Sequence, residues 1–245
     1  MISAFDHFRP HHEELRKRLI RIISAVFLCT LVAYLGKDYI AAFCMQPLFT
    51  AAPELEKLVY TKLTEAFISY IKLSLLAGIL FSFPYILFQM WMFISPGLLA
   101  GEKKAARLIV LWATFLFLGG ACFSFFIALP KILSFFMSYA GPNLTPMPKF
   151  GLYLTFVGRM VLAFGIAFEI PFLMVMAIRT GIVAPHYFSN KRTWFYIAIM
   201  VLSFLLATGE LTATVLLCLP LFLLYEAGIL AGRVFKGKSK PTSSK

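Results

Sequence analysis

The apolar residues of this 245-residue chain are gathered into long blocks, and lysine and arginine concentrate in every second gap between the blocks. Hydrophobic residues make up 60% of the chain and charged residues only 14%, too few for a water-soluble surface. A helix needs about 20 mostly apolar residues to cross a hydrocarbon core of about 30 Å. The pattern therefore predicts a polytopic membrane protein.

Six blocks have the composition of membrane-spanning segments. Backbone N–H and C=O groups inside lipid must pair within their own segment, so each block is predicted to be a helix. We expect one all-α membrane domain over residues 1–235, followed by a tail at 236–245 whose Lys, Ser and Pro content predicts disorder. The predicted spans are residues 22–36, 73–94, 108–129, 152–178, 194–207 and 211–230.

The distribution of basic residues predicts the orientation of the chain. Most lysines and arginines outside the blocks lie before the first block, in the second and fourth gaps, or after the last block. Basic loops stay on the cytoplasmic side, so we expect both termini there. The net charge of +12 then reflects topology and contact with anionic lipid headgroups, and no nucleic-acid partner is expected.

Three segments next to the blocks carry their own predictions. Residues 11–21 are expected to form a short helix on the membrane surface, separate from the first span. The loop at 36–70, interrupted by prolines, must cap the bundle or lie on the surface. The fifth block has a helical length of about 21 Å, so either the bilayer thins beside it or residues 191–193 snorkel and lengthen it.

One ionisable residue lies in the middle of a predicted span. Glu169 precedes Pro171 by two positions in the fourth block. A charge near the bilayer centre costs at least ~2.5–3.5 kcal/mol, so such a residue normally faces a cavity or a partner. We predict a functional role for Glu169. The alternative is a protonated side chain that bonds to a neighbouring helix or to a carbonyl that Pro171 leaves unpaired.

Two glutamates outside the blocks, Glu14 and Glu102, are surrounded by cations. From the residues alone, ordinary surface pairing is favoured, such as Glu14 with Arg18 four positions later. A third glutamate, Glu226, lies close enough to the end of the last block to reach the interface by snorkelling.

Catalytic and metal-binding patterns are absent from the sequence. The four histidines form no HExxH-type pair, the two aspartates lie outside the predicted spans, and the four cysteines form no CxxC pair. We therefore expect no enzyme activity, no cofactor, no metal site and no disulfide.

Several runs, in order along the chain, resemble the TatC family, the large subunit of the twin-arginine protein translocase. The first is HEELRKRL at 12–19, and the most extended is PYILFQMWMFISPGL at 84–98. The run FGIAFEIP at 164–171 contains the intramembrane glutamate. The other matching runs are TEAF at 64–67, IKL at 71–73 and EKK at 102–104. The matches cover nearly the whole chain, which is identified as a member of this family.

The resemblance implies a cupped, curved six-helix bundle in the bacterial inner membrane that receives twin-arginine signal peptides of folded cargo. Glu14 and Glu102 correspond to the family's two acidic residues for the arginine pair. A carboxylate accepts two parallel hydrogen bonds from a guanidinium but only a point contact from lysine, which favours Arg-Arg over Lys-Lys. The expected supporting surface consists of Leu15, Arg16, Phe93 and Pro96.

The resemblance also implies partners inside the membrane. Glu169 is expected to contact the apolar part of the signal peptide or a single-span subunit of the TatA or TatB type. Between the last two blocks the chain departs from the family's Thr-Pro-x-Asp run and later glutamine. Glu210 keeps the acid and Thr214 lies near the glutamine's place, so we expect both at a partner contact. The lipid bilayer and further copies of the chain are the other implied partners, and the proton-motive force is the implied energy source.

Two other functions are alternatives to signal-peptide binding. A small-solute secondary transporter would explain Glu169 and Arg159 within spans, but the chain shows no internal repeat with matching broken helices. A structural assembly factor would tolerate loss of both Glu14 and Glu102.

Overall fold

The computed structural model describes residues 3–53, 55, 58–94, 102–138, 146–179, 182–184, 186–206 and 211–236. Nearly all of these residues are helical, and the β pairing among them is an isolated bridge between Val59 and Lys149. The helices are α1 (Ser3–Leu35), α2 (Lys37–Ala51), α3 (Leu63–Ile94), α4 (Glu102–Phe123), the π-helix η1 (Ser124–Ala128), α5 (Leu129–Ser138), α6 (Phe150–Arg179), α7 (Tyr187–Asn190), α8 (Arg192–Leu206) and α9 (Leu211–Lys236).

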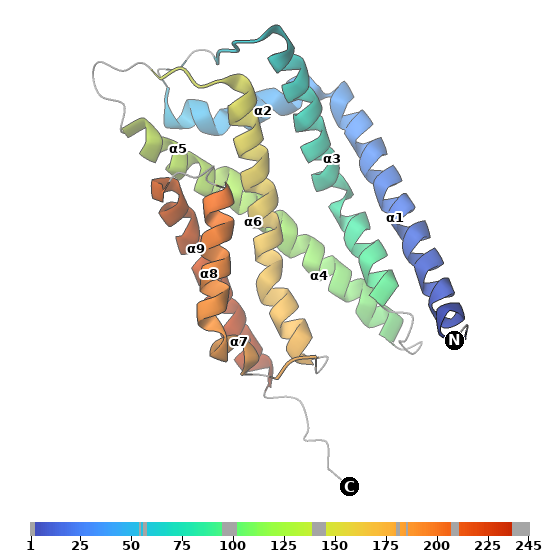
Figure 1. The fold of residues 1–245 in the computed structure, drawn as a ribbon. Coiled ribbons are helices and arrows are strands. Elements are labelled where there is room, and N and C mark those ends of the chain that lie inside the picture. Colours follow the sequence, from blue (N-terminus) through green and yellow to red (C-terminus); the bar gives the residue numbers. More distant parts are fainter. Residues whose placement is uncertain are drawn as a thin grey trace.

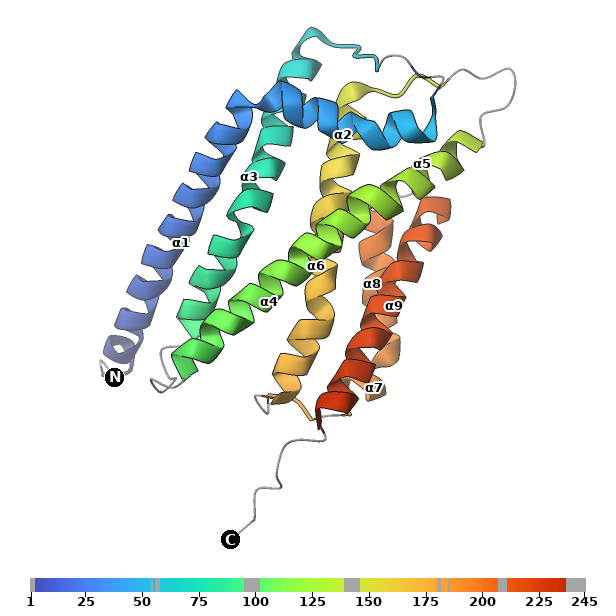
Figure 2. The same cartoon turned by 180° about the vertical axis from the view of Figure 1, so that it is seen from behind.

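The helices form a bundle with two distinct ends (Figure 1). The long helices α1, α3, α6, α8 and α9 run roughly alongside one another, and the continuous rod α4–η1–α5 crosses them obliquely (Figure 2). We call the end where α1 begins and α9 ends the terminal end. At the opposite end, which we call the cap end, α2 lies across the bundle.

Four helical segments are long and apolar enough to cross a membrane, and they correspond to the first four predicted spans, of which two end one residue later, at 36 and 94. They are Glu13–Leu35, Thr64–Phe93, Leu108–Ser138 and Phe150–Ile178. The described part of α8 has 15 residues, about 22 Å of helix, which agrees with the short fifth block. The number of six spans and the cytoplasmic location of the termini stay predictions.

Two local predictions were wrong. Residues 11–21 are not a separate surface helix, because α1 continues from Ser3 to Leu35 and no glycine or proline interrupts it after Pro10. The segment 36–70 is not mainly a loop, because it contains α2 and the first turns of α3. In α2 the side chains of Ala41, Pro47 and Leu48 are buried, so this helix caps the bundle, one of the two placements expected for the segment.

A π-turn joins α4 to α5. The N–H of Leu129 donates to the carbonyl of Ser124, five residues earlier, and Pro130 follows immediately. Proline has no N–H, and its ring conflicts with the carbonyl four residues before it. The wider turn accommodates this conflict, so the helix continues past Pro130 without a break.

Small residues bring the helices close together. A Cβ atom on Gly120 of α4 would lie 2.5 Å from the carbonyl oxygen of Phe164 on α6. On α3, a Cβ at Gly78 would lie 2.7 Å from the backbone nitrogen of Thr30 on α1. Such approaches are typical of membrane helices, which associate through close packing of small residues. The α4–α6 and α1–α3 contacts thus set the framework on which both ends are built.

Candidate functional site

Glu14, the first of the two predicted signal-peptide glutamates, lies half-buried on α1 at the terminal end. Arg18, one turn later, donates from Nε to Glu14 Oε1 at 3.0 Å, and its Nη2 donates to the same oxygen. The pairing that the residues alone favoured is therefore present. Both bonds end on Oε1, and Oε2 accepts no hydrogen bond from the described side chains.

Arg18 is held in turn by α3. Its Nη1 donates to Oε1 of Gln89 at 3.3 Å, and Gln89 Nε2 donates to the hydroxyl oxygen of Tyr85 at 2.7 Å. Gln89 is 4% exposed, so its amide is a fixed partner. This chain of contacts connects α1 to α3 and fixes the carboxylate of Glu14.

The second glutamate, Glu102, begins α4. In both views the first turns of α4 lie at the terminal end, beside the end of α3 (Figures 1 and 2). The backbone therefore places Glu14 and Glu102 at the same end of the bundle. The side chain of Glu102 lies outside the described part, as does Pro96.

Of the predicted supporting residues, Leu15 and Arg16 are exposed on α1, and Phe93 is half-buried in the last turn of α3. These three residues therefore lie on the same two helices as the terminal-end contacts, α1 and α3. They come from segments more than seventy positions apart in the sequence, joined by the Arg18–Gln89 contact.

Glu169 lies on the face of α6 that α4 covers. Its side chain is 5% exposed and lies near the backbone of Phe117. One turn earlier, a Cβ on Gly165 would lie 2.6 Å from the ring of Phe117, which shows how closely α4 packs here. Glu169 Oε1 has no hydrogen-bond partner in the described part of the chain. The carboxyl group is thus buried between α4 and α6, and a bound peptide is not needed to cover it.

Of the two residues predicted at a partner contact between the last two spans, the structure describes one. Thr214 lies in the first turn of α9 and is 5% exposed, so neighbouring helices already cover it. Glu210 lies outside the described residues.

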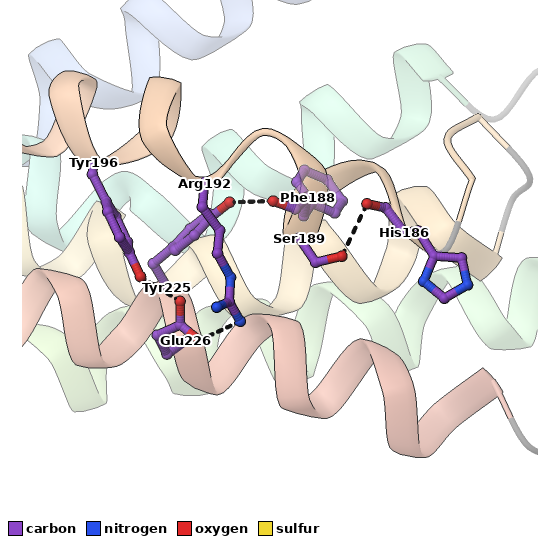
Figure 3. A network of polar contacts seen from close by, with 7 residues as sticks. All are labelled: His186, Phe188, Ser189, Arg192, Tyr196, Tyr225 and Glu226. Atoms are coloured by element: carbon purple, nitrogen blue, oxygen red, sulfur yellow. Dashed lines mark hydrogen bonds and ion pairs between the residues drawn. The ribbon is translucent and has the colours of Figure 1, made fainter.

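A polar cluster between α8 and α9 was not predicted (Figure 3). Glu226 on α9 accepts hydrogen bonds from Arg192 Nη2 at 2.9 Å and from the Tyr196 hydroxyl at 2.5 Å. Beside it, the Tyr225 hydroxyl donates to the carbonyl of Phe188 at 2.7 Å. The sequence did contain a signal for this cluster. Arg192 and Glu226 carry opposite charges and lie at the ends of two predicted spans on the same, predicted cytoplasmic, side. These contacts fix α7 and α8 against α9 at the terminal end.

Cysteine chemistry does not contribute a site in the described structure. Cys29, Cys44, Cys122 and Cys218 are all unpaired, and no group of three metal-ligating side chains comes together among the described residues. Burial raises the pKa of the Cys44 thiol on α2 to about 11, which keeps it protonated and unreactive at neutral pH.

Comparison with known proteins agrees with this arrangement. The family model for "Sec-independent protein translocase protein (TatC)" matches residues 10–220. Proteins with that name from Desulforapulum autotrophicum and Aquifex aeolicus are each 34% identical to the chain. The first alignment covers 95% of this chain and 86% of the relative, and the second covers 94% and 96%. A crystal structure of a twin-arginine translocase receptor, TatC, superposes with a TM-score of 0.85 at 33% identity, covering 92% of this chain and 99% of the other.

Proposed function

Because the chain belongs to the TatC family, we propose that it is the receptor that binds twin-arginine signal peptides, with Glu14 and Glu102 at the terminal end as the site for the two arginines. The family is a component of a protein-transport system and is not an enzyme. Membership sets aside the solute-transporter alternative. The protein is a multi-pass protein of the bacterial inner membrane.

The geometry of Glu14 carries the proposal. Its carboxylate is oriented in advance by Arg18 and Gln89, and Oε2 is left for an incoming donor. A guanidinium of the signal peptide can add its own charge-assisted bonds to Oε2 while Arg18 stays on Oε1. Glu102, at the start of α4, would take the second arginine. Little side-chain entropy is lost on binding, because the carboxylate is already ordered.

The proposal places the terminal end in the cytoplasm. The basic segments at the start of α1, the start of α4, the start of α8 and the end of α9 all lie at that end (Figure 1). This distribution is the one that retains loops on the cytoplasmic side. Signal peptides of folded cargo would therefore meet the glutamates before any segment enters the membrane.

The later steps require the bundle to open. Glu169 and Thr214 are each 5% exposed, so neither can contact a signal peptide or a single-span subunit of the TatA or TatB type in this conformation. We expect the apolar part of the signal peptide, or the partner helix, to displace α4 from α6 and so reach Glu169. Glu169 Oε1, which has no hydrogen-bond partner among the described residues, would then find a donor on the incoming segment.

The test is binding of a twin-arginine signal peptide to the purified protein in detergent, beside a Lys-Lys peptide. Glu14→Ala and Glu102→Ala should each weaken Arg-Arg binding by about 10- to 100-fold, since a hydrogen bond to a charged group contributes about 1.5–3 kcal/mol. Glu13→Ala is the matched control. It removes the same charge from the adjacent exposed position and should leave binding unchanged.

Equal binding of the two peptides, or loss of binding in Glu13→Ala as severe as in Glu14→Ala, would contradict the proposal. The first result would remove arginine recognition, and the second would reduce Glu14 to one part of a diffuse charge effect.

A further inference from the structure

The cap end contains a pocket that the proposed function does not use. It has a volume of about 880 Å³ and lies between α3, α5 and α6, with Leu48 of α2 on its wall. Apolar side chains of α5 and α6 form one side, among them Leu133, Phe136 and Phe156. A cavity of this size is comparable to those that hold ligands of several hundred daltons.

The charged lining of the pocket is mainly cationic. Lys62, Lys72, Lys149 and Arg159 line it, against one carboxylate, Glu65. That carboxylate is already engaged, because Glu65 Oε2 accepts from the backbone N–H of Thr61 at 3.0 Å and from its hydroxyl at 3.3 Å. Within the described chain, the ion pairs are Glu14–Arg18 and Glu226–Arg192, both at the other end. The pocket therefore has an excess of positive charge.

Two of these cations lie on the helical segments Thr64–Phe93 and Phe150–Ile178, and both side chains are exposed. Lys72 comes nine residues after the start of α3 at Leu63, and Arg159 comes nine residues after the start of α6 at Phe150. Each is therefore about 13 Å along its helix, counted from the cap end. A charged side chain at membrane depth is costly unless it meets a counter-charge or water. Because both line the same pocket, one anion can serve both.

We propose that this pocket binds an anionic phospholipid, with its phosphate between Lys72 and Arg159 and its acyl chains against the apolar wall of α5 and α6. The ligand must be anionic to match the excess of cations, and it must be amphiphilic to fill a lining that combines cations with apolar side chains. Lysine and arginine bind phosphate oxygens through charge-assisted hydrogen bonds, and an apolar wall accepts acyl chains.

The occupant is a lipid and not a soluble anion because the two cations lie below the ends of their helices, beside apolar walls. A phosphate joined to acyl chains reaches that depth from the bilayer and gains burial of its chains. A free phosphate ion would enter without that gain. The site lies at the opposite end from Glu14 and stands independently of signal-peptide recognition.

The experiment uses the purified full-length protein after delipidation in detergent. Its thermal unfolding is measured during titration with phosphatidylglycerol, phosphatidylcholine or inorganic phosphate. Phosphatidylglycerol should raise Tm by several degrees, because a ligand that binds only the folded state stabilises it. Phosphatidylcholine should need about tenfold more lipid for the same shift, and inorganic phosphate at equal concentration should give no shift.

Variants locate the site. Lys72→Gln combined with Arg159→Gln should abolish the preference for phosphatidylglycerol, whereas Lys131→Gln, on the exposed surface of α5 outside the pocket, should keep it. If the double variant fails to fold, two other variants replace it. The single substitution Arg159→Gln should weaken the preference for phosphatidylglycerol. The charge-preserving pair Lys72→Arg and Arg159→Lys should keep it. Native mass spectrometry then compares the phosphatidylglycerol retained by each.

Three outcomes would overturn the proposal. The first is an equal rise in Tm with both lipids, and the second is a rise with inorganic phosphate as large as with phosphatidylglycerol. The third is full retention of the preference for phosphatidylglycerol both in Arg159→Gln and in the double variant. The second would make the pocket a simple anion site. The first and third would leave its cations for another partner, such as a carboxylate on a neighbouring helix.

Discussion

The two ends of the bundle manage charge in opposite ways. At the terminal end, Glu14 is paired with Arg18 and Glu226 with Arg192, and each pair connects two helices directly or through Gln89. At the cap end, Lys72 and Arg159 line a pocket without an ion pair in the described structure. Paired charges make the terminal end stable by itself, so a ligand there must add to existing bonds. At the cap end, cations without an ion pair among the described residues can accept an anion from outside.

The two ends can act independently only if the helix packing between them is rigid. A substitution in the α4–α6 contact should therefore have the largest effect on stability. In Gly120→Val, the new Cβ would lie 2.5 Å from the Phe164 carbonyl and 2.9 Å from the Phe168 side chain. Overpacking of this kind costs about 1–3 kcal/mol or more. We expect a marked fall in Tm in detergent, or no folded protein.

The neighbouring glycine is the matched control. At Gly119 a Cβ meets no atom within 4 Å, so Gly119→Val should fold normally. Equal damage from the two substitutions would show that helix propensity matters here and that the α4–α6 contact does not.

The second effect tests the paired end. Glu226→Ala removes the partner of both Arg192 and Tyr196, and we expect a loss of about 1–3 kcal/mol in stability. Thermal unfolding of Glu226→Ala, Tyr196→Phe and the double variant forms a cycle. Because Tyr196 has lost its acceptor in Glu226→Ala, the added Tyr196→Phe change should cost little there. Full additivity of the two losses would contradict a shared network.

A smaller effect, on signal-peptide affinity, is expected from the contact that orients the Glu14 carboxylate. Gln89→Leu removes the α3 partner of Arg18, so Glu14 should be less well fixed. We expect signal-peptide affinity to fall by a factor of about three to ten, corresponding to about 0.6–1.4 kcal/mol. The preference for Arg-Arg over Lys-Lys should fall with it. A loss of stability with unchanged peptide selectivity would assign Gln89 a packing role alone.

The smallest effect should come from the unpaired end. In delipidated detergent, Arg159→Gln removes a charge that repels the neighbouring cations and breaks no ion pair within the described residues. Tm should stay the same or rise slightly, and the free energy of unfolding should change by no more than about 0.5 kcal/mol. A fall as large as that of Glu226→Ala would show that Arg159 is bonded within the protein and would remove the contrast between the ends.

Hydrophobic blocks were enough to predict the helical class and four spans, because lipid leaves a segment one way to satisfy its backbone. The Glu14–Arg18 pair was also predictable, since residues four apart on a helix are neighbours. The continuous α1 was missed because the change from charged to apolar residues near Arg21 was taken as a helix boundary. Composition changes where the helix enters lipid, but its backbone has no reason to end there.

Contacts between distant segments were beyond the sequence. Gln89 lies 71 positions from Arg18, and Arg192 lies 34 positions from Glu226, so only the packing of α3 on α1 and α9 on α8 brings them together. Arg159 was recognised as unusual within a span, but the pocket that it shares with Lys72 depends on how α3 and α6 pack. The burial of Glu169 likewise follows from the approach that Gly165 allows.

The π-turn at Ser124–Ala128 has a consequence for how this chain can vary. One additional residue in a helical turn rotates everything after it by about 100° relative to an uninterrupted α-helix. The rod uses this rotation to present α4 to α6 and then to aim Ile132 and Leu133 of α5 at the core beside α2. Deleting one residue here would make a more regular helix and turn that apolar face toward lipid. Length in these five positions is therefore constrained more tightly than side-chain identity.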